Sequence, residues 1–328
     1  MKRTPPAILL FTLSLLAGGA AFAQQAANYP VRPLRVLVPF APGGASDFVA
    51  RIVQPKLGEV LGQTVVVDNR AGASGNIGVE VSARATPDGY TLFLGNIGTM
   101  AINPSVYPKF PVRPLRDLIA ITQVVDVPTA LAVHPSVPAG SVKAFIAYVK
   151  ARPGKLNFGS AGAGSNGRLE MESFLLETGL KMVHVPYKGG AGAANIALVG
   201  GEVQAGMLTT ASVIPHFKAG RLKVVGVAAK KRVPALASVP TMPESGFPKM
   251  TTGSWQGMYV PAGTPREIVN KLHGVLIKVM GDAEVVRRIE LGGADVITSK
   301  SPAEFAAFMK AENDRFAILV KNVGAAVQ

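Results

Sequence analysis

The stretch from Leu34 to Arg51 has the sequence LRVLVPFAPGGASDFVAR. Leu34 to Val38 is an apolar run typical of a buried strand, and Pro39 to Ala45 is a turn rich in proline and glycine. Asp47 then opens a helical pattern. The free backbone N–H groups and the dipole of a helix N-terminus favour a bound anion. The stretch therefore predicts a strand–loop–helix unit that can hold one.

The loop of this unit contains residues that suit close contact with a ligand. Gly43 and Gly44 let the backbone approach a bound molecule closely, and Ser46 or Asp47 can cap the helix that follows. The questions that remain are which anion is bound, and whether the protein reacts with it or only holds it.

The first 23 residues have the features of a cleaved signal peptide. Lys2 and Arg3 form a basic start, residues 7–17 are mostly apolar, and Ala21-Phe22-Ala23 fits an A-x-A cleavage site. A membrane anchor is the alternative, but the apolar core is too short to span a bilayer well. The sequence therefore predicts a signal peptide over 1–23 and a mature protein in the periplasm.

The composition excludes several kinds of site. The chain has no cysteine, so disulfides, thiolate metal ligands and cysteine nucleophiles are absent. Its formal charge is +14, but the basic residues are spread out, and the densest run, Lys230-Lys231-Arg232, has no aromatic residues interleaved. We therefore expect no nucleic-acid partner. The four histidines lack metal-ligand spacing, so we expect no metal and no cofactor.

Short apolar strands alternate with helical patterns, which indicates an α/β protein with two mostly parallel sheets. Strands are expected at 34–38, 65–68, 91–94, 130–134, 156–159, 182–185 and 224–228, and helices at 48–61, 76–84, 142–150, 168–178, 191–199, 266–280 and 302–320. Residues 124–129 and 247–254 indicate two crossings between domains. We therefore expect a ligand cleft between two lobes. Lobe 1 comprises 24–127 plus 252–328, and lobe 2 comprises 128–251.

A second glycine-rich loop, residues 159–167, lies between an expected strand and an expected helix. Its glycines form the G-x-G-x-x-G pattern of dinucleotide sites, which also needs an acidic residue about 20 positions on. The next strand ends in His184-Val185-Pro186 without one. Ser160, Ser165 and Asn166 instead add donors to a second anion-binding helix N-terminus, which would clamp a small carboxylate against the first. A plain turn with a helix cap remains open as an alternative.

No catalytic constellation stands out along the chain. The G-x-S-x-G, P-loop and H-E-x-x-H motifs are absent. Glu170 and Glu172 are two residues apart on an expected helix, so they point to different faces and do not form an acid–base pair. We therefore expect binding rather than catalysis.

Short motifs in order along nearly the whole mature chain resemble one known family. They are Val38-Pro39-Phe40-Ala41-Pro42-Gly43-Gly44 with Asp47, Asn69-Arg70-Ala71-Gly72, Asp88-Gly89-Tyr90-Thr91-Leu92, His184-Val185-Pro186-Tyr187-Lys188-Gly189 and Pro261-Ala262-Gly263-Thr264-Pro265. As a set they resemble the periplasmic solute-binding proteins of the tripartite tricarboxylate transporter (TTT) family, the TctC or Bug (Bordetella uptake gene) group. The resemblance implies a type II-like periplasmic-binding-protein fold whose two lobes close on a small carboxylate.

In this family, backbone groups of both lobes hold the ligand carboxylate, partly through ordered waters. The resemblance places loop 39–47 and region 98–103 in one half of the site, and loop 160–166 with segment 187–189 in the other. The expected ligand-binding residues are Phe40, Pro42, Gly43, Gly44, Ser46, Asp47, Asn96, Thr99, Asn103, Ser160, Gly164, Ser165, Asn166, Arg168, Tyr187, Lys188, Gly189 and Thr209.

Two positions in the second lobe depart from the family pattern. Leu208 stands where the family often has an acidic residue, and Arg168 stands where it often has a histidine. A lost carboxylate and a gained arginine favour an anionic ligand over an amino acid.

The resemblance implies a monomeric transport receptor that is not an enzyme. It would capture a di- or tricarboxylate or a related organic acid and deliver it to the membrane permease subunits of a TTT system. Two alternatives remain open. One is a sensor that presents its ligand to a sensor kinase, and the other is an exported enzyme that acts on a small organic acid.

Overall fold

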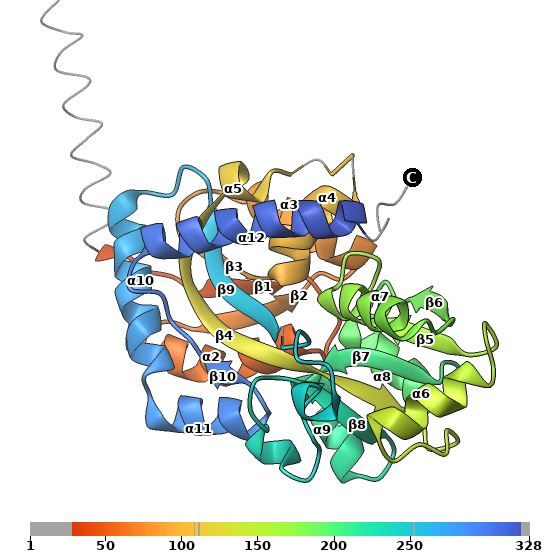
Figure 1. Ribbon diagram of the computed structural model, residues 1–328. Coiled ribbons are helices and arrows are strands. Elements are labelled where there is room, and N and C mark those ends of the chain that lie inside the picture. Colours follow the sequence, from red (N-terminus) through yellow and green to blue (C-terminus); the bar gives the residue numbers. More distant parts are fainter. Residues whose placement is uncertain (1–27, 108, 111, 252, 323–328) are drawn as a thin grey trace, which may run out of the picture.

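The longest strand of the structure, β4 (Leu118–Val133), belongs to two sheets. Its first part, Leu118 to Pro128, pairs with β9 (Gly253–Pro261), and its second part, from Thr129 on, pairs with β7 (Ala205–Thr209). The two sheets are therefore joined through one strand into a continuous ten-stranded sheet. Helices surround each half, and the two halves form the two lobes seen in Figure 1.

The computed structural model describes residues 28–107, 109–110, 112–251 and 253–322. The predicted signal peptide, 1–23, lies outside the described residues. Across the described part of the chain, every helix is too short or too polar to span a bilayer.

The first sheet has the strand order β2–β1–β3–β9–β4, with β10 paired to β4. β1 runs parallel to both β2 and β3, whereas β9 is antiparallel to β3 and to β4. The bounds of these strands are Leu34–Val38 for β1, Val65–Asn69 for β2, Thr91–Asn96 for β3 and Asp295–Val296 for β10.

Successive side chains of β1 enter two different cores, because side chains alternate across a strand. Val36 and Val38 pack with helices on one face of the sheet, and Leu37 packs with helices on the other. The first face carries α2 (Ala45–Leu61), α10 (Arg266–Met280) and α11 (Ala283–Leu291), and the second carries α3 (Asn76–Ala83) and α12 (Pro302–Asn322). Burial on both faces explains why four of the five residues of this strand are apolar; the fifth, Arg35, is half-buried and donates to Asp68 and Thr91.

The second sheet has the order β4–β7–β5–β6, and β8 also pairs with β4. Leu131 faces a core shared with α6 and α7, and its neighbour Ala130 faces a core shared with α8 and α9. The elements of this lobe are β5 (Asn157–Ser160), β6 (Val183–Pro186), β8 (Lys223–Ala228), α6 (Val142–Lys150), α7 (Asn166–Thr178), α8 (Ala191–Val199) and α9 (Thr210–Lys218). Two four-residue helices, α4 (Asn103–Val106) and α5 (Pro114–Asp117), belong to the first lobe.

This architecture confirms the predicted α/β fold with two lobes. The parallel pairs lie within each lobe, β1 with its two neighbours and β5 with β6 and β7. The pairs made by β4 are antiparallel, because the chain leaves the first lobe along β4 and re-enters it along β9 in the opposite direction. The predicted boundary at 127/128 lies beside the change of sheet at Pro128, while the lobe bounds as a whole stay a prediction.

Pro55 lies inside α2, where the sequence predicts a kink or an early end of the helix. The helix instead continues to Leu61 and ends at Gly62, which adopts a left-handed conformation with φ of 65°. Residues on both sides of the proline, including Val49, Val53 and Leu57, are fully buried against the sheet. Tertiary packing therefore outweighs the one backbone hydrogen bond that the proline removes.

Asp126 is a mostly buried carboxylate on β4, two residues before the change of sheet. Its Oδ1 atom has no hydrogen-bond partner among the described residues, and its strand partner across from it is Asp295. Burial, and then the negative charge of Asp295, raise the pKa of Asp126 to about 6. The ionised group is therefore a source of instability near the crossing.

We expect Asp126→Asn to stabilise the protein at neutral pH. Between the ordinary pKa of 3.8 and the folded-state value of about 6, the native state holds more protons than the unfolded state, so wild-type stability falls as pH rises. The free energy of unfolding of the variant should exceed that of the wild type by little at pH 4 and by roughly 3 kcal/mol at pH 8.

Denaturant unfolding at five pH values between 4 and 8 measures this difference. Asp314→Asn, which changes an exposed carboxylate on α12, is the matched control and should show no such trend. A gap between Asp126→Asn and the wild type that stays constant with pH would contradict the assignment.

Candidate ligand-binding site

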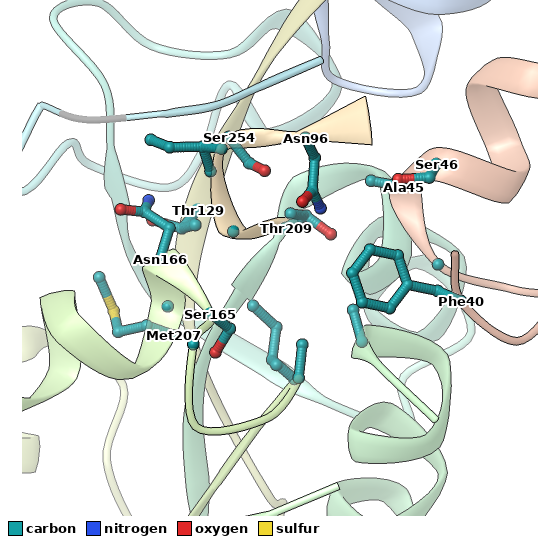
Figure 2. Close-up of a pocket in the computed structure, with 18 of the residues that line it drawn as sticks. Phe40, Ala45, Ser46, Asn96, Thr129, Ser165, Asn166, Met207, Thr209 and Ser254 are labelled. Carbon is teal, nitrogen blue, oxygen red and sulfur yellow. The ribbon is translucent and has the colours of Figure 1, made fainter. Parts of the chain in front are cut away.

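A cavity of about 60 Å³ lies between the two lobes, beside the point where β4 changes sheets. Phe40, Ala45 and Ser46 of the first lobe form one side of it, and Thr129 and Asn166 lie on the opposite side (Figure 2). Its volume has room for a few water molecules, because a cavity needs about 10–15 Å³ to hold one water molecule. The lobes therefore stand close together in this structure.

Helix N-termini from both lobes open into this cavity. The wall includes Ala45 at the start of α2, Asn166 at the start of α7, Ala191 at the start of α8, and Thr209 immediately before α9. Each N-terminus contributes unpaired backbone N–H groups and a partial positive charge of about half an elementary charge. Together they make the cavity suited to an anion.

All polar side chains that the structure shows on the cavity wall are uncharged. They are Ser46, Ser74, Asn96, Thr129, Ser165, Asn166, Thr209 and Ser254. Within the described residues, no three histidine, aspartate or glutamate side chains lie together as ligands for a metal ion. Attraction for an anion therefore comes from the backbone and from neutral donors.

The N-terminus of α2 is left open by its capping residue. The sequence predicts Ser46 or Asp47 as the cap, but α2 begins earlier, at Ala45, with Gly44 as the capping residue and no side-chain cap. Ser46 and Asp47 therefore lie inside the first turn. A glycine cap leaves the first N–H groups without a side-chain acceptor, so they remain available to a ligand.

Asp47 supports the loop before α2 from behind. Its carboxylate accepts hydrogen bonds from the Gly43 backbone N–H at 3.1 Å, from Asn69 Nδ2 at 3.1 Å and from Arg51 Nε at 3.0 Å. Burial alone would raise the pKa of Asp47, but these hydrogen bonds outweigh burial and lower it. The carboxylate is thus held ionised and tied to the loop, off the cavity wall.

Of the expected ligand-binding residues, eight lie on the cavity wall: Phe40, Gly44, Ser46, Asn96, Gly164, Ser165, Asn166 and Thr209. Two others, Thr99 and Asn103, hold wall residues in place, and a third, Ser160, bonds within the loop that carries the wall residues Ala161 and Gly164. Thr99 N–H donates to Asn96 Oδ1 at 3.0 Å, Asn103 Nδ2 donates to the Ser74 carbonyl at 3.0 Å, and Ser160 Oγ donates to the Gly162 carbonyl at 3.1 Å.

The remaining expected residues lie off the wall. The loops that form the contact between the lobes contain Pro42, Gly43 and Gly189. Lys188 is exposed. The Tyr187 hydroxyl donates to Glu202 at 3.2 Å. The guanidinium of Arg168 donates to the Ala163 carbonyl at 3.0 Å and lies 3.7 Å from Glu172.

Some wall residues were missed by the sequence interpretation. Thr129 and Ser254 lie at the two predicted crossings, and their position there was a usable signal, because strands that cross between lobes form the floor of a cleft. Met207 and Leu208 lie at the end of β7, a strand that the hydrophobic pattern did not predict. Met207 carries no sequence signal for binding, and Leu208 is marked in the sequence only as a departure from the family pattern.

Glycines make the contact between the lobes unusually close. A Cβ atom at Gly192, on α8, would lie 2.6 Å from the Pro42 carbonyl oxygen of the other lobe. Cβ atoms at Gly164 and Gly162 would overlap Asn103 and Ser74 in the same way. The Ala41 N–H also donates across the contact to the Gly189 carbonyl at 3.1 Å. The lobes meet backbone to backbone around the cavity.

His184 lies behind the second loop and adds no positive charge. Its Nε2 atom is 2.7 Å from Ser160 Oγ, and its ring stacks on Phe158 with ring centroids 4.9 Å apart. Burial, and then the nearby Arg168, lower the pKa of His184 to about 4. The imidazole is therefore neutral at neutral pH.

Comparison with known proteins agrees with this geometry. Residues 49–325 match the model of the family described as "Tripartite tricarboxylate transporter family receptor". The chain is similar to Protein BugT of Bordetella pertussis, with 35% identity over 312 residues that cover 95% of each chain.

Two solved structures with bound ligands are also similar. One is R. palustris Rpa4515 with adipate, at 34% identity and a TM-score of 0.87, with 90% of this chain and 99% of that chain covered. The other is MatC (Rpa3494) from Rhodopseudomonas palustris with bound malate, at 31% identity and a TM-score of 0.83, covering 89% and 100%. The chain therefore belongs to the receptor family of the tripartite tricarboxylate transporters, the family that its sequence motifs predicted.

Proposed function

We propose that this protein binds a small organic carboxylate between its lobes in the periplasm and delivers it to the permease subunits of a TTT-type transporter. The observation that carries the proposal is a cavity between the lobes with an uncharged wall, into which α2, α7, α8 and α9 direct their N-termini. The relatives crystallised with adipate and with malate support a carboxylate as the ligand.

Capture would proceed by closure of the lobes around the anion. Backbone N–H groups of both lobes can reach one ligand only when the lobes are close, so the ligand binds the closed form better than an open one and shifts the population toward it. Waters can bridge the remaining distances at little cost in affinity. The permease would then recognise the closed form.

The cavity favours a receptor over an enzyme. The described wall carries four serine hydroxyl groups, those of Ser46, Ser74, Ser165 and Ser254. No histidine, lysine or carboxylate shares that wall to activate them. His184 contacts Ser160 behind the loop instead. We therefore infer that the ligand leaves unchanged. From the sequence, we also propose that the protein acts as a monomer and that a signal peptide over 1–23 exports it.

A ligand titration tests the proposal directly. We expect the mature protein, residues 24–328, to respond saturably to at least one of a panel of mono-, di- and tricarboxylates and aromatic acids. Trp255, the one tryptophan of the chain, provides the fluorescence signal, because it is buried beside the crossing into β9 and bonded to Glu312 at 2.8 Å.

Nuclear magnetic resonance of the recovered ligand completes this experiment. An unchanged ligand is expected, and its conversion to a product would instead indicate an exported enzyme. No response to any carboxylate, by fluorescence or by thermal shift, would contradict the proposed function.

We expect Gly192→Ala to weaken ligand binding while leaving the unliganded protein folded. The added methyl group would meet the Pro42 carbonyl across the lobe contact, so it opposes closure rather than the packing within either lobe. Overpacking of this kind costs roughly 1–3 kcal/mol, which corresponds to an increase of about five- to 150-fold in Kd.

Calorimetric titration measures the change in Kd, and thermal unfolding without ligand checks the fold. Gly274→Ala is the matched control, because this glycine also lies in a helix but has open space around it. It should leave Kd unchanged. Equal affinities of Gly192→Ala and the wild type would show that binding does not need this lobe contact.

A further inference from the structure

A buried carboxylate lies directly behind one side of the cavity. Glu170 is on α7, one turn after Asn166, and is 7% exposed. It accepts a hydrogen bond from Thr129 Oγ1 with one oxygen and from Asn166 Nδ2, at 3.0 Å, with the other. Thr129 and Asn166 both line the cavity, whereas Glu170 does not. Glu170 therefore fixes how two wall residues present themselves to a ligand.

These contacts use the side-chain hydrogens of both wall residues. A threonine hydroxyl has a single hydrogen, and that of Thr129 points to Glu170. An asparagine amide has two, and Asn166 Nδ2 directs them to Glu170 and to the Gly253 carbonyl, at 3.5 Å. Neither side chain has a hydrogen left to donate to a ligand. The Thr129 oxygen keeps lone pairs that can accept one.

The opposite side of the cavity has the reverse character. Phe40, Ala45 and Ser46 lie across from Thr129 and Asn166 in Figure 2, and the uncapped N-terminus of α2 donates there. The α2 side of the cavity is thus suited to a carboxylate. On the other side the backbone N–H groups at the start of α7 still donate, but the side chains of Thr129 and Asn166 have no hydrogen to offer and lie in front of a carboxylate of the protein itself. A second ligand carboxylate on that other side would meet oxygen lone pairs without a hydrogen from either side chain.

Arg168, the cation that could have attracted a second ligand carboxylate to this side, lies off the cavity wall. The sequence suggests Arg168 as a residue that favours an anionic ligand, but the structure places its guanidinium against the Ala163 carbonyl and Glu172, off the cavity wall. No charged side chain of the described residues lies on that wall. A ligand hydroxyl, which donates one hydrogen bond and carries no charge, fits the accepting side.

We propose that Glu170 is a positioning residue that sets the ligand class of this receptor. Acting through Thr129 and Asn166, it makes the far side of the cavity hydrogen-bond accepting, so that the protein selects a hydroxy monocarboxylic acid over the dicarboxylic acid of the same length. This inference rests on the proposed function, because it assumes that one carboxylate binds at the α2 side.

Matched pairs of acids test the selection. The pairs are 4-hydroxybutanoate with succinate and 6-hydroxyhexanoate with adipate, each titrated calorimetrically into the wild-type mature protein. We expect the hydroxy acid to bind roughly tenfold or more tightly than the diacid in the pair whose length fits the cavity, because a site with buried acceptors rejects a group that cannot donate to them. A diacid that binds as tightly as its hydroxy partner, or more tightly, overturns the inference.

Glu170→Gln tests the role of the carboxylate. The glutamine amide can accept from only one of the two wall residues through its oxygen, so Thr129 or Asn166 is freed to donate into the cavity, and the negative charge is gone. We expect the ratio of the two Kd values to move toward the diacid by roughly tenfold. A purely structural role would change both Kd values by the same factor and leave the ratio unchanged, which would overturn the assignment.

Two further variants guard against a folding defect and against a general charge effect. Thr129→Val keeps the shape of the side chain and removes the acceptor, so it should weaken binding of the hydroxy acid relative to the diacid. Glu177→Gln makes the same chemical change at the exposed end of α7 and should leave the ratio as in the wild type. A shift of equal size in Glu177→Gln would contradict a local role of Glu170.

The outcomes separate this inference from the proposed function. If no acid of either kind binds, the proposed function fails. If acids bind without the expected preference, the receptor function stands and only the role of Glu170 fails.

Discussion

Ligand binding in this molecule depends on one strand that is hydrogen-bonded into two sheets. β4 pairs with β9 up to Pro128 and with β7 from Thr129 on, so one strand belongs to both lobes, and withdrawing it from either sheet would expose a buried ladder of backbone groups. Breaking such a ladder leaves unpaired N–H and C=O groups in an apolar core, which is costly. The floor of the cavity is therefore fixed, and its sides are loops and helix ends that the two lobes bring to it.

Closure of the lobes around the ligand explains why an anion site can be built without a charged side chain. A buried arginine or lysine on the wall would have to lose its hydration whenever the lobes close, at a cost of several kcal/mol. Backbone N–H groups at helix N-termini are already oriented and only partly charged, so they lose less. Affinity then depends on how many of these N–H groups the lobes bring to the ligand at once. A receptor that must release its ligand again gains from this, because opening the lobes removes half of the contacts together.

The sequence predicted the parts of the site whose function depends on the backbone. The loop before α2 and the loop before α7 were identifiable, because glycine, proline and capping residues between a strand and a helix have a direct conformational meaning. Long side chains in the same segments were less predictable. Arg168 and Tyr187 have the expected place in the chain, but their side chains are directed by Glu172, one turn along the same helix, and by Glu202. Position in a loop indicates where the backbone goes, not where a flexible side chain ends.

The elements that were missed have a common physical origin. The hydrophobic pattern predicted a strand over 130–134, which covers only the last four residues of the sixteen-residue strand β4, and did not predict β9. Both strands contain buried polar residues where the chain crosses between the lobes, such as Thr129 and Ser254. These residues interrupt the apolar run that marks a strand. Two of the residues that lower the sequence signal, Thr129 and Ser254, thus also line the cavity.

Buried carboxylates at the crossing show what such a site costs. Asp126, on β4, is mostly buried and has one oxygen without a partner. Glu170, on α7, accepts a hydrogen bond from Thr129, three residues further along β4. Apolar residues would pack better at both places, since burying a carboxylate is unfavourable unless its hydrogen bonds repay the lost hydration. Glu170 gains such bonds and orders the cavity wall with them, whereas Asp126 has one oxygen without a partner and lowers the stability of the strand that joins the lobes. The cost of burying a carboxylate is therefore offset at Glu170, beside the cavity, and only partly offset at Asp126, on the strand that joins the lobes.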